Sequence, residues 1–332
     1  MMASLMRVFV AGATGYIGQH VSAELVRRGH DAVCLVRPQA GVHGKLDPLA
    51  IRERLDGCDV RFGDVTDAES LAKVVRGNQF DAVVSCLASR SGAPDDAWRI
   101  DHQANSQLLR VLGQAGITQF VLLSAICVQR PRLAFQHAKL AFEHELRQAP
   151  VRHSIVRPTA FFKSLSGQIE RVKAGKPYVV FGDGNLTACT PIAERELAVF
   201  LVDCLGDPAR FNTTLPIGGP GPPQTPLQQG ELLFRVLGRA PRFRHVPIAL
   251  MRGIAATSSA TSRVLPSLQD KAEFARTGLY YATESMLVFD ERAGRYDASA
   301  TPSFGSVTLE DHFRDVLEDG LGDHHLGDHA VF

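Results

Sequence analysis

A glycine-rich turn near the start of the chain is typical of a dinucleotide site. Gly12, Gly15 and Gly18 are spaced three residues apart, between a short apolar run and a helical pattern that begins at Ile17. The first glycines allow a tight turn that brings backbone N–H groups against a pyrophosphate, and Gly18 lets helix and strand approach closely. Because the motif opens a strand-helix-strand unit, it predicts dinucleotide binding rather than a simple turn.

The residue after the second apolar run indicates which dinucleotide binds. Proteins that bind NAD usually carry an acid there, which accepts hydrogen bonds from the ribose 2′-hydroxyl. In this sequence the position holds Arg37, and Asp31 stands before the run, at its opposite end. A guanidinium suits a 2′-phosphate through its charge and planar donors, whereas an acid would repel that group. We therefore expect NADPH as the coenzyme; the alternative is that Arg37 is a solvated loop residue.

Two further strand ends are expected to border the coenzyme. Residues 63–65 follow the third apolar run and should lie near the adenine, and residues 86–89 follow the fourth run. Both segments would also suit ordinary strand ends, so they support the prediction only together with the glycine turn. The predicted cofactor contacts are Gly12, Thr14, Gly15, Tyr16, Ile17, Gly18, Arg37, Asp64, Val65, Leu87, Ala88, Ser89, Lys139 and Pro158.

Six short apolar runs, separated by helical patterns, must position these residues. The runs are Val8 to Ala11, Ala32 to Val36, Val60 to Phe62, Ala82 to Cys86, Phe120 to Leu123 and His153 to Val156. Such alternation is the signature of a parallel sheet wrapped by helices. The predicted fold class is α/β, a Rossmann-type doubly wound parallel sheet with a smaller C-terminal substrate-binding lobe.

The pattern becomes less regular after Arg157-Pro158, which suggests a division of the chain. Residues 1–157 are expected to form the NADPH-binding core, 158–319 a substrate-binding lobe interleaved with the end of the core, and 320–332 a flexible tail. The Pro/Gly-rich stretch from Pro216 to Pro223 is expected to lack regular structure. Helices are predicted at Gln228 to Leu237 and Thr308 to Glu318, and Ile254 to Arg263 is predicted to be a mobile lid or a helix, with a membrane contact left open. The tail histidines His324, His325 and His329 are expected to be solvated rather than metal ligands.

Composition excludes several classes of protein. Among 332 residues, 36 Lys and Arg balance 35 Asp and Glu, so no global field draws the protein to nucleic acid. The six cysteines include no C-x-x-C pair and are expected to be reduced, as in a cytosolic protein. No apolar run reaches the roughly 18 residues of a membrane span, and no signal or transit peptide is recognised, so we expect a cytoplasmic protein. A peripheral membrane contact and the oligomeric state are left open.

The catalytic residues of one reductase superfamily are retained in part. The glycine motif resembles that of the extended and atypical short-chain dehydrogenase/reductases, most of which combine a Ser after strand five with a Tyr-x-x-x-Lys pair. Here Ser124 is present, while the positions of the pair hold Phe135 and Lys139. Loss of the phenol disfavours an alcohol dehydrogenase, because reducing a ketone requires protonation of a developing alkoxide. It disfavours reduction of a carbon double bond much less.

Longer runs resemble the divinyl chlorophyllide a 8-vinyl reductase family of chlorophyll and bacteriochlorophyll synthesis. The resemblance is most specific at Ser124 to Gln129 and at Ser154 to Ser164, and a Phe at the tyrosine position is part of that family's pattern. The full set of runs that carry it is Ser85 to Arg90, Trp98 to Asp101, Phe120 to Gln129, Phe135 to Phe142, Ile155 to Ser164, Lys176 to Gly184, Leu215 to Pro220, Tyr280 to Leu287 and Thr308 to Phe313. It implies NADPH as donor and, as acceptor, the 8-vinyl group of a magnesium-containing chlorophyllide or protochlorophyllide.

Given that substrate, a division of labour among the residues can be stated as a hypothesis. Lys139 would orient the nicotinamide ribose, Ser124 would border the reacting carbon, and the proton would come from water or a nearby polar group. Phe135 would be part of the wall. A flat apolar ring calls for aromatic walls and a cation for its carboxylate, the latter from Lys163 or Arg157. The predicted substrate contacts are Phe135, Phe161, Phe162, Lys163, Tyr178 and Phe181; core positions are the alternative for the aromatics.

No protein metal site is predicted, although a histidine could ligate the substrate's Mg²⁺. His137 and His153 are the nearest candidates, and ordinary core or surface positions are favoured for both. Three other functions remain open at this point. They are an isoflavone-reductase-like reductase of another substrate, an NADP-sensing regulator without catalysis, and a respiratory-complex subunit that uses NADPH only for stability.

Overall fold

A parallel sheet forms the centre of the protein in the computed structural model, which describes residues 5–37 and 47–319. Its strands are β1 (Arg7–Ala11), β2 (Asp31–Val36), β3 (Asp59–Phe62), β4 (Ala82–Ser85), β5 (Gln119–Leu123), β6 (Arg152–Pro158) and β8 (Thr213–Ile217). They lie in the order β3-β2-β1-β4-β5-β6-β8, and every neighbouring pair is parallel. This confirms the predicted doubly wound α/β sheet, and the six predicted strands agree with the observed bounds to within two residues.

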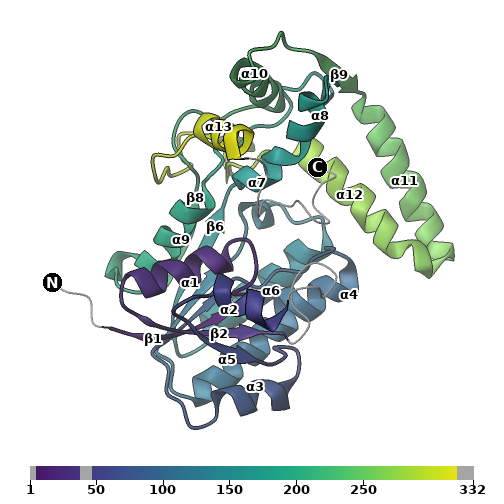
Figure 1. Ribbon diagram of the computed structural model, residues 1–332. Helices are drawn as coiled ribbons and strands as arrows, with labels where there is room; N and C mark the ends of the chain where they lie inside the picture. The colour runs from purple at the N-terminus through teal and green to yellow at the C-terminus, as the bar shows by residue number, and fades with distance from the viewer. Residues whose placement is uncertain (1–4, 38–46, 320–332) are drawn as a thin grey trace.

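Helices cover both faces of the sheet (Figure 1). Alternating side chains of the buried strands pack against them. Val8 and Val10 of β1 face the cluster that includes α1 (Gly18–Arg27), α2 (Pro48–Arg54) and α9 (Glu194–Asp203). Phe9 and Ala11 face the opposite cluster, which includes α3 (Ala68–Val75), α5 (Asn105–Gln114) and α6 (Ala134–Gln148). A short helix α4 (Pro94–Ala97) continues into a π-helical segment (Trp98–Ala104) that leads into α5.

The remaining elements form a lobe at the carboxyl edge of the sheet, with a hydrophobic cluster of its own. Its helices and strands are α7 (Phe162–Leu165), α8 (Ile169–Lys173), β7 (Tyr178–Phe181), α10 (Pro226–Val236), β9 (Phe243–Val246), α11 (Ile248–Val264), α12 (Gln269–Thr283), β10 (Val288–Asp290), β11 (Arg295–Asp297) and α13 (Leu309–Asp319). Strands β7 and β9 pair in parallel, and β10 and β11 pair antiparallel. Helices α11 and α12 form a hairpin that projects from the lobe (Figure 1). Short 3₁₀ turns occur at Ile126–Gln129, Ser166–Gln168, Pro208–Arg210 and Pro266–Leu268.

The prediction that Pro216 to Pro223 lacks regular structure is wrong at its start. Pro216 and Ile217 lie within β8, where they pair with Arg157 and Pro158 of β6. Proline is tolerated there because β8 is an edge strand, so the missing N–H interrupts no ladder on the open side. The sheet is therefore one strand wider than the sequence predicted.

Other predictions for the second half of the chain are confirmed or lie beyond the described residues. The two predicted helices correspond to α10 and α13, and Ile254 to Arg263 forms part of α11. The tail 320–332, with its three histidines, lies outside the described residues. Among the helices of residues 5–37 and 47–319, none is both long enough and apolar enough to cross a membrane.

Candidate functional site

The glycine turn between β1 and α1 is so close-packed that side chains are excluded from two of its positions. Gly12 has a φ of +80°, and a Cβ there would lie 2.7 Å from the carbonyl oxygen of Cys86. A Cβ at Gly18 would lie 2.0 Å from the carbonyl oxygen of Gly12. This packing brings the first N–H groups of α1 to the end of the sheet, where dinucleotide folds bind the pyrophosphate. The residues present therefore fit a dinucleotide.

Because the strands are parallel, the predicted cofactor residues follow one another along a single edge of the sheet. Arg37 comes directly after β2, Asp64 and Ser89 lie in the loops after β3 and β4, and Ser124 comes directly after β5. Pro158 is the last residue of β6. Strand order reverses between β1 and β4, and in open α/β sheets ligands bind outside the carboxyl ends at such a point.

Arg37 lies among charged groups of both signs at this edge. Partial desolvation, followed by the positive charge of Arg90, lowers the pKa of the Arg37 guanidinium, while Asp64 opposes the shift. Arg90 is in the loop after β4, and its backbone N–H donates to Asp96 at 3.0 Å. The Arg37 guanidinium, directly after β2, has the charge and the planar donors that favour a phosphate.

The loop after β3 is shaped by its own hydrogen bonds. Asp64 Oδ1 accepts from the backbone N–H of Thr66 at 2.8 Å and from its hydroxyl at 2.7 Å. Val65 is 5% exposed, and its carbonyl accepts from Gln107 Nε2 at 2.7 Å. These contacts hold the two predicted adenine neighbours in a fixed turn, and the direct contact of either with the coenzyme remains a prediction.

Lys139 is buried beside a carboxylate that the sequence analysis did not single out. Its Nζ lies 2.9 Å from Oδ1 of Asp101, and the two side chains are 11% and 0% exposed. Ser89, a predicted cofactor contact, donates its hydroxyl to the other oxygen of Asp101 at 2.6 Å. The lysine predicted to hold the nicotinamide ribose is thus connected through Asp101 to the loop after β4.

Ser124 contacts a second buried carboxylate, that of Glu143, which lies on α6 with Lys139. Its hydroxyl donates to Glu143 Oε1 at 2.6 Å, and Glu143 also forms a two-pronged ion pair with Arg157. Arg147 reaches the same carboxylate at 2.8 Å. Arg157, predicted as one candidate for the substrate carboxylate, is therefore engaged within the protein. The position of Ser124 beside a reacting carbon remains a prediction.

This network should make stability depend on pH. Burial alone would raise the pKa of Glu143, but hydrogen bonds and charge from Arg157, with help from Ser124 and Arg147, outweigh it and lower the pKa. A pKa that is lower in the folded state adds stability above the ordinary glutamate value of about 4.3 and loses it as pH falls through that region. Denaturant unfolding of the native protein should therefore show a decline in the free energy of unfolding as pH falls from about 5 toward 3.

The variant Glu143→Gln tests the same network. Removing one partner of a buried ion pair leaves the Arg157 charge uncompensated, and we expect a loss of roughly 3 kcal/mol at pH 7. The difference between the variant and the native protein should shrink as pH falls, because the native carboxylate becomes protonated. A difference that is constant from pH 7 to pH 3 would contradict this account. Glu170→Gln, at an exposed ion pair with Lys173, is the control for surface effects.

The structure separates the predicted substrate aromatics into two groups. Phe161 is half-buried, with its ring centroid 6.4 Å from that of Tyr16, and Lys163 Nζ lies 4.7 Å from the Tyr16 ring centroid. These residues lie beside the glycine turn. Phe135, at the start of α6, is also half-buried and packs against a small cluster with Tyr280. They remain candidates for the substrate wall.

Phe162 and Tyr178 instead belong to the hydrophobic cluster of the lobe. Their side chains are 1% and 4% exposed, and Tyr178 contacts Phe243 with ring centroids 6.1 Å apart. We therefore withdraw both from the proposed wall, because each is a core residue of the lobe. Phe181, at the end of β7, is half-buried and stays a candidate.

The two histidines considered for the substrate's Mg²⁺ occupy ordinary positions. His137 is exposed on α6, and His153 is 8% exposed within β6, where burial lowers its pKa. Among the residues that the structure describes, no group of three or more His, Cys, Asp or Glu is arranged to hold a metal ion.

Several contacts around the site come from residues that the sequence analysis missed. Helix α12 covers the start of α6: Glu273 accepts from the backbone N–H of Ala134 at 2.7 Å, and the Tyr280 hydroxyl donates to the Cys127 carbonyl at 2.8 Å. Tyr280 does begin one of the family-like runs, but nothing in that run indicated its partner. The α11–α12 hairpin is thereby anchored next to Phe135.

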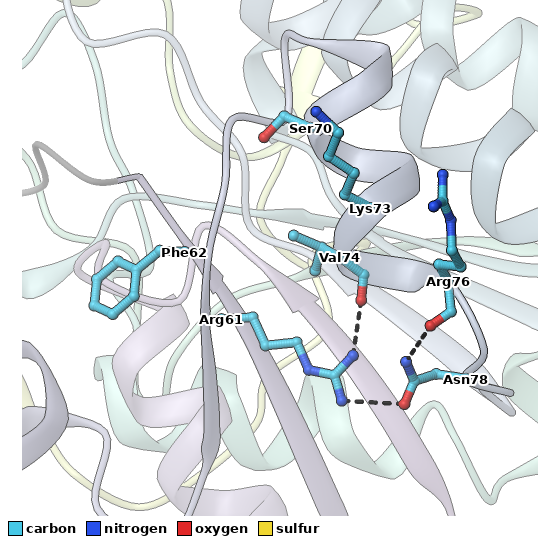
Figure 2. A pocket seen from close by; sticks show the side chains of 7 residues that line it. All are labelled: Arg61, Phe62, Ser70, Lys73, Val74, Arg76 and Asn78. Atoms are coloured by element: carbon cyan, nitrogen blue, oxygen red, sulfur yellow. Dashed lines mark hydrogen bonds between the residues drawn. The ribbon is translucent and has the colours of Figure 1, made fainter.

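A separate cavity lies away from this edge. An open hollow of about 470 Å³ lies beside β3 and α3. Among the side chains that line it (Figure 2), Arg61 donates to the Val74 carbonyl at 2.7 Å and to the Asn78 side chain at 3.1 Å. The guanidinium is held by these hydrogen bonds and by an ion pair with Asp59 at 2.7 Å. The hollow lies beside the edge strand, two strands from β1, and we assign it no part in the site.

The fold and the glycine turn define a Rossmann-type NAD(P)H-binding protein, and residues 12–208 match the NAD(P)H-binding family. The solved complex of leucoanthocyanidin reductase with NADPH from Vitis vinifera has the same fold, with a TM-score of 0.66, 17% identity and coverage of 96% of this chain and 99% of that one. This likeness supports the fold alone, whereas the sequence match establishes the coenzyme class.

Sequence relatives identify the family more narrowly. The chain is 50% identical to divinyl chlorophyllide a 8-vinyl-reductase, chloroplastic, of Oryza sativa subsp. indica, over 98% of this chain and 82% of that protein. It is 47% identical to the Arabidopsis thaliana protein of the same name, over 97% of this chain and 79% of that protein. The chain belongs to the divinyl chlorophyllide a 8-vinyl-reductase family, which confirms the resemblance found in its sequence.

Proposed function

We propose that this chain catalyses the NADPH-dependent reduction of the 8-vinyl group of divinyl chlorophyllide a, or of divinyl protochlorophyllide a, to an ethyl group. The observation that carries the proposal is 50% identity to a reductase of that name over 98% of the chain. Two features of the site support it: a glycine turn that fits a dinucleotide, and a buried lysine at the edge where the nicotinamide is expected.

The reaction divides naturally between the coenzyme and the protein. NADPH, when bound, supplies a hydride to the terminal carbon of the vinyl group, and a proton then completes the ethyl group. Negative charge left by the hydride spreads over the tetrapyrrole, so a strong acid at position 135 is unnecessary. Phe135 accordingly serves as wall, together with Phe161 and Phe181 and with Lys163 near the carboxylate.

The chain's own residues bind and orient the reactants. The N–H groups of the glycine turn hold the pyrophosphate, Arg37 holds the 2′-phosphate, and Lys139 holds the nicotinamide ribose. Ser124 borders the reacting carbon in this proposal, and its hydrogen bond to Glu143 fixes its orientation. The proton comes from water or from a polar group of the site.

An optical assay tests the reaction. Purified protein with NADPH and divinyl chlorophyllide should shift the Soret band to that of the monovinyl product, with NADPH consumed only when the pigment is present. A protein that only senses NADPH, or uses it for stability, would bind the coenzyme without this consumption. A reductase of another substrate would leave the Soret band unchanged.

Arg37 should determine the preference between coenzymes. Charged hydrogen bonds contribute about 1.5–3 kcal/mol, so Arg37→Ala should raise the Kd for NADPH roughly tenfold to 100-fold and leave that for NADH nearly unchanged. Titration by nicotinamide fluorescence measures both constants. The exposed Arg292 in the β10–β11 turn provides the control Arg292→Ala. An unchanged ratio of the two constants would show that Arg37 does not contact the 2′-phosphate.

The cellular location of this chain is a further part of the proposal. The two relatives reported above are chloroplastic by name. We propose that this chain acts in the cytoplasm of a bacterium that makes bacteriochlorophyll. It binds a tetrapyrrole and no nucleic acid. If it touches photosynthetic membranes, the α11–α12 hairpin is the part that makes the contact. Fractionation of cells that express a tagged chain would place it in the soluble or the membrane fraction.

A further inference from the structure

We propose that Asp101 is a positioning residue. It fixes the Lys139 ammonium relative to Ser89, in the loop after β4, so that both face the nicotinamide ribose. The proposal deepens the function proposed above and rests on Lys139 being the residue that binds the ribose. It concerns a side chain to which the sequence analysis gave no role. Three observations carry it: the burial of the pair, the shared carboxylate, and the π-helical turn that presents it.

The first observation is that a buried ammonium needs a counter-charge. Lys139 and Asp101 are 11% and 0% exposed, and their atoms lie 2.9 Å apart. Breaking such a pair leaves an uncompensated charge inside the protein, which is costly. The attraction between the two charges holds the ammonium next to Oδ1 of Asp101 and so restricts where its three N–H donors can reach.

The second observation is that Asp101 divides its two oxygens between two parts of the site. Oδ1 faces Lys139 of α6, and Oδ2 accepts from the Ser89 hydroxyl at 2.6 Å, with the Ser89 N–H at 3.4 Å. One rigid carboxylate thus sets the distance between the helix that carries the lysine and the loop that follows β4. Displacing that loop would displace the lysine as well.

The third observation is the backbone that carries Asp101. It lies in the π-helical segment Trp98–Ala104, and π-turns often mark functional positions because they redirect a side chain. Asn105, 1% exposed, donates to the carbonyls of Ile100 at 3.3 Å and Asp101 at 3.1 Å and accepts from Ser85 at 2.6 Å. The widened turn is therefore satisfied by a side chain and tied to the end of β4.

Other groups near Lys139 do not replace Asp101. Cys86, after β4, and Cys127, in the turn after β5, both sense the lysine's charge, but burial raises the pKa of Cys127 and raises that of Cys86 to about 12. Both thiols are therefore neutral at pH 7. Glu143, one turn further along α6, is paired with Arg157 and Arg147. Within the described part of the chain, Asp101 is the carboxylate in ion-pair contact with Lys139.

The experiment compares Asp101→Asn with Asp101→Glu, and measures NADPH affinity by fluorescence between pH 6 and pH 9 as well as turnover of divinyl chlorophyllide. Asp101→Asn should raise the Kd for NADPH about tenfold at pH 7, and more as pH rises, because the amide no longer stabilises the buried ammonium. Turnover should fall by about 100-fold at most, since a small displacement of a positioned group has effects of that size. Asp101→Glu keeps a carboxylate, so the dependence of its NADPH affinity on pH should lie between that of Asp101→Asn and that of the native protein.

Glu170→Gln is the matched control, because Glu170 and Lys173 also form a 2.9 Å lysine–carboxylate pair, on the surface of the lobe. It should leave affinity and turnover unchanged. If folded Asp101→Asn bound NADPH with native affinity at every pH, the proposal would be overturned. The same affinity series decides the matter even if the native protein proved unable to reduce the pigment, so failure of the two proposals can be told apart.

Discussion

Replacing Lys139 with methionine is expected to lower kcat for NADPH-dependent pigment reduction by about 100-fold or more. The ammonium is a buried charged group at the edge where the nicotinamide ribose is expected, and misplacement of the reactants there has effects of that size. Arginine at the same position should recover a part of the loss, because it keeps the charge while changing the geometry. Steady-state rates at saturating NADPH and pigment measure the effect.

A double variant separates loss of stability from loss of activity. Lys139→Met leaves the Asp101 carboxylate buried and unpaired, at a cost of roughly 3 kcal/mol. The double variant Lys139→Met with Asp101→Asn removes both charges and should regain much of the stability while staying inactive. Lys173→Met, on the surface, controls for loss of a lysine elsewhere. A double variant with native stability and native kcat would show that Lys139 takes no part in the reaction.

Gly18→Ala is expected to abolish NADPH binding. The added Cβ would lie 2.0 Å from the Gly12 carbonyl oxygen and 2.8 Å from its carbonyl carbon, so the turn between β1 and α1 must open. Opening it moves the N–H groups that would hold the pyrophosphate. We expect the Kd for NADPH to rise by about 100-fold or beyond the measurable range.

The control for Gly18→Ala is a glycine with room around it. Gly113 lies within α5, and a Cβ there would meet nothing within 4 Å, so Gly113→Ala should leave binding unchanged and stabilise the helix by up to about 1 kcal/mol. If Gly18→Ala remained folded by circular dichroism and bound NADPH normally, the glycine turn would not be the coenzyme site.

The core of the fold could be predicted because its signals are local. Strands β1, β2, β4 and β5 are short apolar runs whose side chains are buried on both faces of the sheet. The glycine turn and Arg37 follow from their positions after β1 and β2. Strand β8 was missed because Pro216 argues against a strand unless one knows that the strand lies at an edge of the sheet.

The parts of the site that were not predicted depend on contacts between distant segments. Asp101 and Lys139 are 38 residues apart, and nothing near either residue indicates that they form a buried pair. The same holds for Tyr280, which reaches Cys127 across 153 residues. The burial of Phe162 and Tyr178 in the lobe favours the core positions left open for them, because an aromatic residue of a lobe core and one of a binding wall look alike in sequence.

Transfer of deuterium tests the central claim most directly. Protein incubated with divinyl chlorophyllide and NADPH deuterated at the nicotinamide C4 position should yield the monovinyl pigment with the label in the new 8-ethyl group, as read by mass spectrometry and NMR. The other hydrogen should come from solvent. Recovery of unlabelled divinyl pigment beside fully reduced coenzyme, from protein that demonstrably binds NADPH, would contradict the account.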